Sequence, residues 1–367
     1  MNNAHNDPAL KLLVDRVRDA AAAGAQMRIV GGGTKDFYGE VPAGEPLHTD
    51  LLEGISSYEP TELVVTARAG TLLSELEATL AEKGQCLAFE PPHLGPAGTV
   101  GGMVAAGLAG PSRAAVGGVR DFVLGATLLD GRAKVMSFGG QVMKNVAGYD
   151  VSRLLAGSMG TLGLILEVSL KVLPVAPATL TLRFDLDEAL ALNRLNAWAG
   201  QPLPLNASAW WDGTLVVRLR GAQAAVASAA RQLGGEALDA ALADVFWNGL
   251  RHQRDDFFVR AGQATASGGS SLWRLSVPST APPIALAGEQ LIEWGGAQRW
   301  AITPTPACEV REAALKAGGH ATLYRARDKS AGVFAPLKSP LDRIHRELKK
   351  SFDPAGLFNP GRLYPGL

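Results

Sequence analysis

Gly98-Thr99-Val100-Gly101-Gly102 and Gly157-Ser158-Met159-Gly160-Thr161-Leu162-Gly163-Leu164-Ile165 are the stretches that decide the fold of this 367-residue chain. Glycines this dense, mixed with Thr and Ser at strand ends, let the backbone approach a ligand and aim its N–H groups at it. A similar element occurs earlier, where the apolar run Met27-Arg28-Ile29-Val30 leads into Gly31-Gly32-Gly33-Thr34-Lys35. Because the element recurs, we expect these loops to bind the phosphates of a cofactor through the main chain.

Two common nucleotide-binding motifs are missing from the sequence. The loop 31–35 has no third glycine at the spacing of the dinucleotide fingerprint, and no Gly-x-x-x-x-Gly-Lys-Ser/Thr occurs anywhere. These absences argue against a doubly wound dinucleotide-binding domain, a phosphate-loop NTPase and a nicotinamide dehydrogenase.

The composition sets further limits on function. Basic and acidic residues balance at 35 each, which gives no reason to expect nucleic acid or an anionic membrane surface as a partner. Cys86 and Cys308 are the only cysteines, too few for an iron–sulfur cluster, so any such cluster must sit on another chain. The polar start 1–7 does not resemble a secretory signal, and no apolar run is long enough to span a membrane. We therefore expect a cytoplasmic protein without a direct membrane span, associated with a membrane at most through its partners.

Hydrophobic periodicity predicts mixed helices and strands, and thus an α+β fold. Asp7-Pro8 is typical of a helix start, and 63–67 and 124–138 are predicted to form a strand and a hairpin. The proline-flanked segment Leu173-Pro174-Val175-Ala176-Pro177 indicates a domain boundary. The first domain is accordingly expected at 1–174.

Beyond the boundary the pattern changes to a split β-α-β arrangement of the ferredoxin-like kind. The expected elements are strand 180–185, helix 187–199, strand 205–211, strand 214–219 and helix 222–233, with further strands near 272–277, 297–302 and 320–326 extending the same sheet. A helix at 341–352, with Leu341, Ile344, His345 and Leu348 on one side, leads back to the first domain. We expect a second domain at 178–338 and a C-terminal helix and tail at 339–367.

These motifs resemble the FAD-linked oxidase family of the vanillyl-alcohol oxidase and p-cresol methylhydroxylase type. The resemblance covers the first half and the last thirty residues, and it includes Arg120-Asp121-Phe122-Val123-Leu124-Gly125, Gly148-Tyr149-Asp150 and Phe352-Asp353-Pro354-Ala355-Gly356-Leu357-Phe358-Asn359-Pro360-Gly361-Arg362. Within the family, Pro91-Pro92-His93, the stretch 142–150 and the short length are similar to the E subunits of bacterial glycolate oxidases. The resemblance implies a two-subdomain FAD-binding domain of the p-cresol methylhydroxylase type and a ferredoxin-like cap that recognises the substrate.

The resemblance also implies which residues bind FAD. They are the first loop Gly31, Gly32, Gly33, Thr34 and Lys35; the second loop Pro92, Gly98, Thr99, Gly101 and Gly102; the partial match Ser112 and Arg113; the third loop Gly160, Thr161, Gly163 and Ile165; and Asn359 in the C-terminal tail. Relatives that tether FAD covalently through the first loop have a histidine there, whereas this loop continues Thr34-Lys35-Asp36. We therefore expect non-covalent FAD.

The sequence leaves the catalytic residues unassigned. Oxidation of a 2-hydroxy acid needs a base for the hydroxyl proton and cations for the carboxylate. Relatives with this activity often carry a histidine-rich metal motif in the cap, but this sequence has none, and we expect no metal site. His320 is the nearest substitute, with Arg325 or Arg327 as carboxylate anchors, and His93 is a second candidate; a structural role remains open for both histidines.

Three functions stay open from the sequence. The first is the FAD-binding subunit of a glycolate oxidase that acts on a small 2-hydroxy acid together with a second flavin subunit and an iron–sulfur subunit. The second is a self-sufficient FAD-dependent oxidase or dehydrogenase of another small hydroxylated substrate. The third is a flavin-binding assembly subunit that performs no chemistry.

Overall fold

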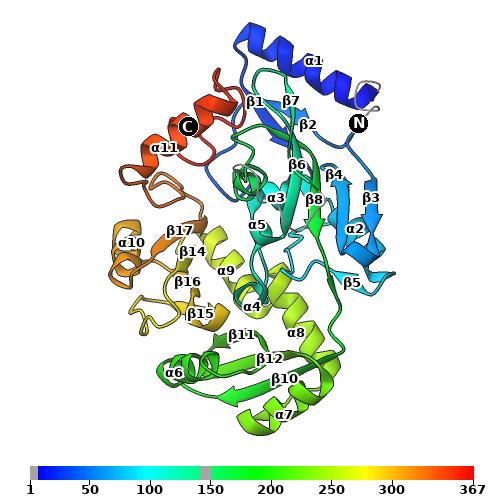
Figure 1. Cartoon of the computed structure of the whole chain (residues 1–367). Helices are drawn as coiled ribbons and strands as arrows, with labels where there is room; N and C mark the ends of the chain where they lie inside the picture. The colour runs from blue at the N-terminus through cyan, green and yellow to red at the C-terminus, as the bar shows by residue number, and fades with distance from the viewer. Residues whose placement is uncertain (1–6, 141–149) are drawn as a thin grey trace.

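The computed structural model describes residues 7–140 and 150–367. The N-terminal part and the C-terminal α11 form the upper half of the molecule in Figure 1, and a large sheet with its helices forms the lower half. Residues 142–149, most of the stretch 142–150 that resembles the E subunits, lie outside the described residues, so that part of the resemblance stays a prediction.

The upper half combines two small αβ units. Its elements are α1 (Pro8–Ala23), β1 (Met27–Val30), β2 (Glu45–His48), β3 (Ile55–Glu59), β4 (Val64–Arg68), α2 (Leu73–Ala81), β5 (Gln85–Cys86), α3 (Val100–Ala106), α4 (Arg113–Val116), α5 (Val119–Phe122), β6 (Val123–Leu129), β7 (Val135–Gly139), β8 (Leu164–Lys171) and β9 (Leu173–Pro174). The first unit packs α1 on the parallel pair β1–β2, and the second is an antiparallel sheet in the order β3-β4-β8-β6-β7.

Local sequence explains how α1 forms. The Asp7 carboxylate accepts a hydrogen bond from the N–H of Ala9 at 2.9 Å, and Gly24 ends the helix in the left-handed conformation. Leu13 and Val17 recur at helical spacing and are buried. The helix predicted to begin at Asp7-Pro8 is confirmed.

The lower half is one eight-stranded sheet in the order β13-β10-β12-β11-β15-β16-β14-β17 (Figure 1). Its elements are β10 (Ala178–Asp185), α6 (Glu188–Ala199), β11 (Leu205–Trp211), β12 (Thr214–Gly221), α7 (Gln223–Leu233), β13 (Glu236–Ala237), α8 (Ala240–His252), α9 (Asp256–Ser267), β14 (Ser271–Ser276), β15 (Glu289–Glu293), β16 (Gln298–Thr303), α10 (Ala307–Lys316) and β17 (His320–Arg325). The predicted ferredoxin-like cap and the extension of its sheet are confirmed.

The strand order shows that the cap contains the ferredoxin-like arrangement twice. In the first half the strands lie side by side as β13-β10-β12-β11, which is the strand order 4-1-3-2 of a ferredoxin-like unit. The second half continues the sheet as β15-β16-β14-β17, which is the same order read from the opposite edge. The second strands of the two halves, β11 and β15, pair antiparallel at the centre through Trp210 and Ile292. Between β14 and β15 the second half has the loop 277–288 where the first half has α6.

Helices α8 and α9, which the sequence analysis did not predict, cover one face of this sheet and meet the upper half. Trp247, Phe257 and Phe258 pack there in one buried cluster with Tyr38, Leu108 and Met159 of the upper half. The two halves of the molecule therefore share a hydrophobic core at their junction.

Charged side chains reinforce the junction. Glu90 pairs with Arg218 at 2.7 Å and with Arg220 at 3.1 Å, and the Arg218 side chain is 4% exposed. Glu77 pairs with Arg251 of α8. Nearby Arg218 opposes the effect of burial and lowers the pKa of Glu90, so the Glu90 carboxylate stays ionised.

The predicted C-terminal helix is confirmed as α11 (Leu341–Phe352). Leu341 and Ile344 are half exposed, whereas Leu348 and Phe352 pack against the core of the upper half. Lys349 is buried because its ammonium group donates to the Asp353 carboxylate at 2.7 Å and to main-chain oxygens. Across the described ranges, no helix combines the length and apolar character that crossing a bilayer requires.

Candidate functional site: a glycine-lined cleft

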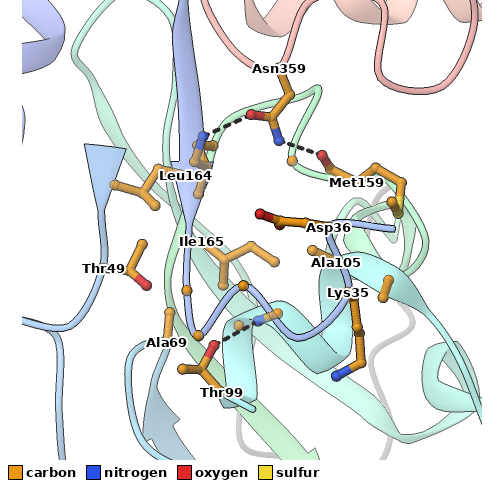
Figure 2. Close-up of a pocket in the computed structure, with 18 of the residues that line it drawn as sticks. Lys35, Asp36, Thr49, Ala69, Thr99, Ala105, Met159, Leu164, Ile165 and Asn359 are labelled. Carbon is orange, nitrogen blue, oxygen red and sulfur yellow. Dashed lines mark hydrogen bonds between the residues drawn. The ribbon is translucent and has the colours of Figure 1, made fainter. Parts of the chain in front are cut away.

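The upper half contains an open cleft. Most of its lining comes from the three glycine loops and the C-terminal tail (Figure 2). The lining residues are Ile29, Gly31, Gly32, Gly33, Thr34, Lys35, Asp36, Thr49, Ala69, Thr99, Gly101, Gly102, Ala105, Ala106, Met159, Gly160, Gly163, Leu164, Ile165, Asn359 and Arg362.

The first loop presents main-chain N–H groups to the cleft. Among the described residues, the N–H groups of Gly32, Gly33, Thr34 and Lys35 donate to no protein acceptor. Carbonyls at and just after the end of the loop are occupied instead, because the Arg362 guanidinium donates to the oxygens of Lys35 at 3.3 Å, Asp36 at 3.0 Å and Tyr38 at 2.5 Å. This division leaves donors free for an anion such as a pyrophosphate.

Close approach of the first two loops requires glycine. A Cβ on Gly32 would lie 1.4 Å from the carbonyl oxygen of Ala97, and a Cβ on Gly31 would lie 2.5 Å from Oγ1 of Thr99. The hydroxyl of Thr99 in turn accepts from the N–H of Gly102 at 3.2 Å and starts α3. The close approach of the two loops therefore requires that positions 31 and 32 carry no side chain.

Asn359 joins the tail to two other parts of the cleft (Figure 2). Its Oδ1 accepts from the N–H of Ile29 at 2.8 Å, and its Nδ2 donates to the oxygen of Met159 at 2.6 Å. The side chain also packs on Gly160, where a Cβ would meet Nδ2 at 2.6 Å and where φ is +72°. The amide thus fixes β1 against the third glycine loop.

Lys35 supplies a positive charge at the cleft. Its ammonium nitrogen lies 3.3 Å from Oγ1 of Thr34 and 3.4 Å from the oxygen of His93, and no carboxylate pairs with it in the described structure. Burial lowers the pKa of Lys35 to about 8. An anion in the cleft would compensate this desolvated charge.

Comparison with known proteins agrees with these features. The family model described as "FAD binding domain" matches residues 11–139, which include the first two loops. Glycolate oxidase subunit GlcE of Escherichia coli strain K12 is 46% identical over 355 residues, and the match covers 97% of both chains. The chain belongs to the FAD-linked oxidase family. Its cofactor is FAD.

Other known proteins are similar to this FAD-linked oxidase either over part of its sequence or in fold alone. A D-lactate dehydrogenase of Anaerostipes hadrus is 31% identical over 173 residues, which cover 47% of this chain and 35% of that protein. Among solved structures, alkyldihydroxyacetonephosphate synthase has a TM-score of 0.63 at 14% identity, over 95% of this chain and 74% of that chain. The structural likeness shows that the fold extends through the cap.

The cleft brings together most of the FAD-binding residues that were predicted from the sequence. Those that line it are Gly31, Gly32, Gly33, Thr34, Lys35, Thr99, Gly101, Gly102, Gly160, Gly163, Ile165 and Asn359. Their contact with FAD stays a prediction. The lining supports it, because free N–H groups, a desolvated Lys35 and glycines at the points of closest approach all suit a dinucleotide.

The other predicted residues lie outside the lining. Pro92 lines a different cavity, under the cap, and the oxygen of Gly98 accepts from Leu73. Ser112 is buried and donates to the oxygen of Ala88, and the hydroxyl of Thr161 donates to Ser158. Arg113 is exposed and stacks 4.7 Å above the ring of Trp294.

Sequence reasoning missed Arg362, which organises the first loop. Its position in Phe358-Asn359-Pro360-Gly361-Arg362 was noticed, but a lone arginine after a turn gives no signal that it will reach carbonyls more than 320 residues earlier. Asp36, Thr49 and Met159 also line the cleft and were not predicted.

The candidate catalytic residues lie apart from one another. His93 contacts Glu77, with 2.9 Å between Nε2 and Oε2, and its ring lies 4.9 Å from that of His252 at the junction of the two halves. Arg325 stacks 3.6 Å above the ring of Phe37, and His320 is exposed at the start of β17. The structure does not assemble His320 and Arg325 into one site with His93.

Proposed function

We propose that this chain is the FAD-binding subunit of a glycolate oxidase that converts a small 2-hydroxy acid into the 2-oxo acid. One observation carries the proposal: the match to glycolate oxidase subunit GlcE spans 97% of each chain, cap and tail included. The partial match to a D-lactate dehydrogenase supports the same substrate class. The chain is accordingly an oxidoreductase acting on CH–OH groups.

Bound FAD supplies a hydride acceptor. The protein's part in the cleft is to hold the cofactor: main-chain N–H groups of the first loop would bind its phosphates, and Lys35 would add one positive charge. Arg362 and Asn359 position these groups, since both side chains are committed to main-chain partners. None of the described lining residues is His, Cys or Tyr, which supports non-covalent binding.

The same proposal includes partner subunits. GlcE is named as one subunit of glycolate oxidase, and we infer a multi-subunit complex for this chain, with a second flavin subunit and an iron–sulfur subunit that accepts the electrons. The two cysteines of the sequence support placing the cluster elsewhere, because Cys86 is partly buried and unpaired and Cys308 is exposed and unpaired. We infer a cytoplasmic location, with any membrane contact made by a partner.

The test is spectroscopic. The full chain is purified, its visible spectrum is recorded, and the spectrum is repeated without oxygen after addition of glycolate and then of D-lactate. We expect a flavin spectrum, and we expect the iron–sulfur and second flavin subunits to copurify with this chain when the three are expressed together. A chain that takes up no FAD, alone or with partners, would contradict the proposal.

A further inference from the structure

A second cavity lies between the cap sheet and the upper half. It is lined from the cap by side chains of β14 to β17 and by α8, and from the upper half by the segment Leu108–Pro111. Ala105 and Ala106, directly before this segment, line the cofactor cleft. A single stretch of chain therefore borders both cavities.

Glu293, at the end of β15, is the acid group of this cavity. It is 4% exposed, and its Oε2 accepts from Nε1 of Trp300 at 2.6 Å and from Nε2 of Gln298 at 2.9 Å. Its Oε1 accepts from no described residue, although the side chain lines the cavity. A buried carboxyl with one oxygen unused is costly unless a further partner occupies that oxygen.

Several groups around Glu293 set its proton affinity. Burial raises its pKa to about 7, against the opposing effect of the Trp300 and Gln298 hydrogen bonds on β16. Asp255, at the start of α9, raises the pKa further, and Arg274 of β14 lowers it. The remaining cation of the lining, Arg251 of α8, is held by Glu77 and the oxygen of Pro91. Glu293 can therefore gain or release a proton near neutral pH.

Arg274 is the free cation of the cavity. It is half-buried and lies on the same face of the sheet as Trp300, its direct neighbour across β14 and β16. Within 7–140 and 150–367, its guanidinium makes no hydrogen bond and no ion pair, although it lies near Glu293. A guanidinium without an acid partner, in a cavity walled by Phe258, Trp300 and Tyr324, favours a small carboxylate.

We propose that this cavity binds a small 2-hydroxy acid, with its carboxylate on Arg274 and its hydroxyl on Glu293. The inference rests on the function proposed above and places the substrate site in this chain. In the oxidation, the hydroxyl O–H bond breaks and its proton goes to Oε1 of Glu293. The Cα hydrogen leaves with its electron pair for FAD, which is reduced as the acid becomes a 2-oxo acid.

Tyr324 closes the cavity on the side of β17. It is fully buried, and its hydroxyl and the Gln253 side chain hydrogen-bond at 2.9 Å. Its ring lies 4.7 Å from that of Trp300 and 5.4 Å from that of Tyr38, which follows the first glycine loop. This aromatic wall limits the site to small acids and makes Tyr324 a positioning residue.

The test measures binding and flavin reduction separately on the full, FAD-loaded chain without oxygen. The variants are Arg274→Gln and Glu293→Gln, and the control is Arg260→Gln, an exposed cation stacked on Trp211 in the same cap. Glycolate affinity is measured by calorimetry, and flavin reduction by loss of visible absorbance after rapid mixing. Thermal unfolding checks that each variant folds, and Arg274→Lys replaces Arg274→Gln should that variant fail to fold.

We expect Arg274→Gln to weaken glycolate binding at least tenfold, because a charge-assisted hydrogen bond is lost. Glu293→Gln keeps an oxygen for Trp300 and Gln298, so we expect binding within about threefold and reduction at least 100-fold slower. In the parent chain the reduction rate should rise with pH through about 7, as Glu293 loses its proton, and this rise should vanish in Glu293→Gln.

Three results would overturn the inference while leaving the proposed function intact: FAD-loaded chain that binds no glycolate, wild-type binding in Arg274→Gln, or wild-type reduction in Glu293→Gln. Failure to bind FAD would instead contradict the proposed function. D-lactate and a larger 2-hydroxy acid, 2-hydroxyglutarate, serve as size probes. We expect the larger acid to bind at least tenfold more weakly than glycolate.

Discussion

The cofactor cleft and the cap cavity lie next to each other but are built from different groups. Glycine N–H groups dominate the lining of the cleft, and its side chains mainly hold the loops in place. The cap cavity presents side chains instead, with Glu293 and Arg274 among aromatic rings. A main-chain site binds any ligand with the right phosphates, whereas a side-chain site can select among acids and move a proton. If both proposals hold, the cleft binds the cofactor and the cap cavity selects the substrate.

The largest expected effect tests the main-chain character of the cleft. Gly32→Ala places a Cβ 1.4 Å from the oxygen of Ala97, so the first two loops must separate. We expect loss of bound FAD, measured as the ratio of flavin to protein absorbance after purification. Gly262→Ala is the control, since nothing lies within 4 Å of its added Cβ on α9. There we expect full FAD content and up to about 1 kcal/mol of added stability.

The second-largest effect concerns the junction between the upper half and the cap, where the cap cavity lies. Arg218→Met removes one partner of a buried ion pair and leaves Glu90 with Arg220, so we expect the free energy of unfolding to fall by about 3 kcal/mol. Arg183→Met breaks an exposed pair with Asp185 on the same sheet, and we expect a loss below about 1 kcal/mol. Urea unfolding measures both. Equal losses in the two variants would show that the buried Arg218–Glu90 pair stabilises the protein no more than the exposed Arg183–Asp185 pair does.

A smaller effect separates loop positioning from FAD contact. Asn359→Ala removes two hydrogen bonds that join β1 to the third glycine loop, and we expect a loss of about 1–3 kcal/mol in stability together with weaker FAD binding. Asn196→Ala removes comparable amide hydrogen bonds in the cap and should leave FAD affinity unchanged. Fluorescence titration with FAD measures the affinity. If both variants bound FAD as the parent chain does, Asn359 would have no role in the cleft.

The smallest effect is a pH dependence of FAD binding through Lys35. Burial holds the pKa of the free Lys35 ammonium at about 8, and phosphates would raise that pKa in the complex. FAD binding should therefore be tightest below pH 8 and weaken severalfold between pH 7 and pH 9, as free Lys35 loses its proton. Lys35→Met should bind more weakly and show no such change, while Lys83→Met keeps the parent profile.

The difference between the two regions also explains how far the sequence could be interpreted. Glycine loops leave a pattern of spacing, which is why Gly31, Gly101 and Gly160 could be assigned to one cleft. Glu293 and Arg274 leave none, because they come from two strands separated along the chain and no motif or fixed spacing links them. Their proximity depends on strand register, which pairs β14 and β15 with β16.

The secondary structure, too, could be predicted from the sequence only in part. The predicted strands and helices of the cap and the limits of α11 follow from apolar periodicity, whereas α8 and α9 were not predicted. The burial of Lys349 on α11 could not be predicted, because its ammonium group reaches inward to Asp353 and main-chain oxygens, and a sequence pattern assigns lysine to the surface. Pro92 was assigned to the cleft by family resemblance, yet it lies under the cap beside Gly110.

The hydrogen bond between Asn359 and Ile29 joins residues 330 positions apart, and this has a consequence for synthesis in the cell. At about 5–20 residues per second, translation separates the emergence of the two residues by roughly 15–65 seconds. During that time the first glycine loop exists without the side chains of Asn359 and Arg362 that hold it. The complete site can therefore bind FAD only after residues 359–362 have been synthesised, and nascent chains that still lack these residues should carry no flavin.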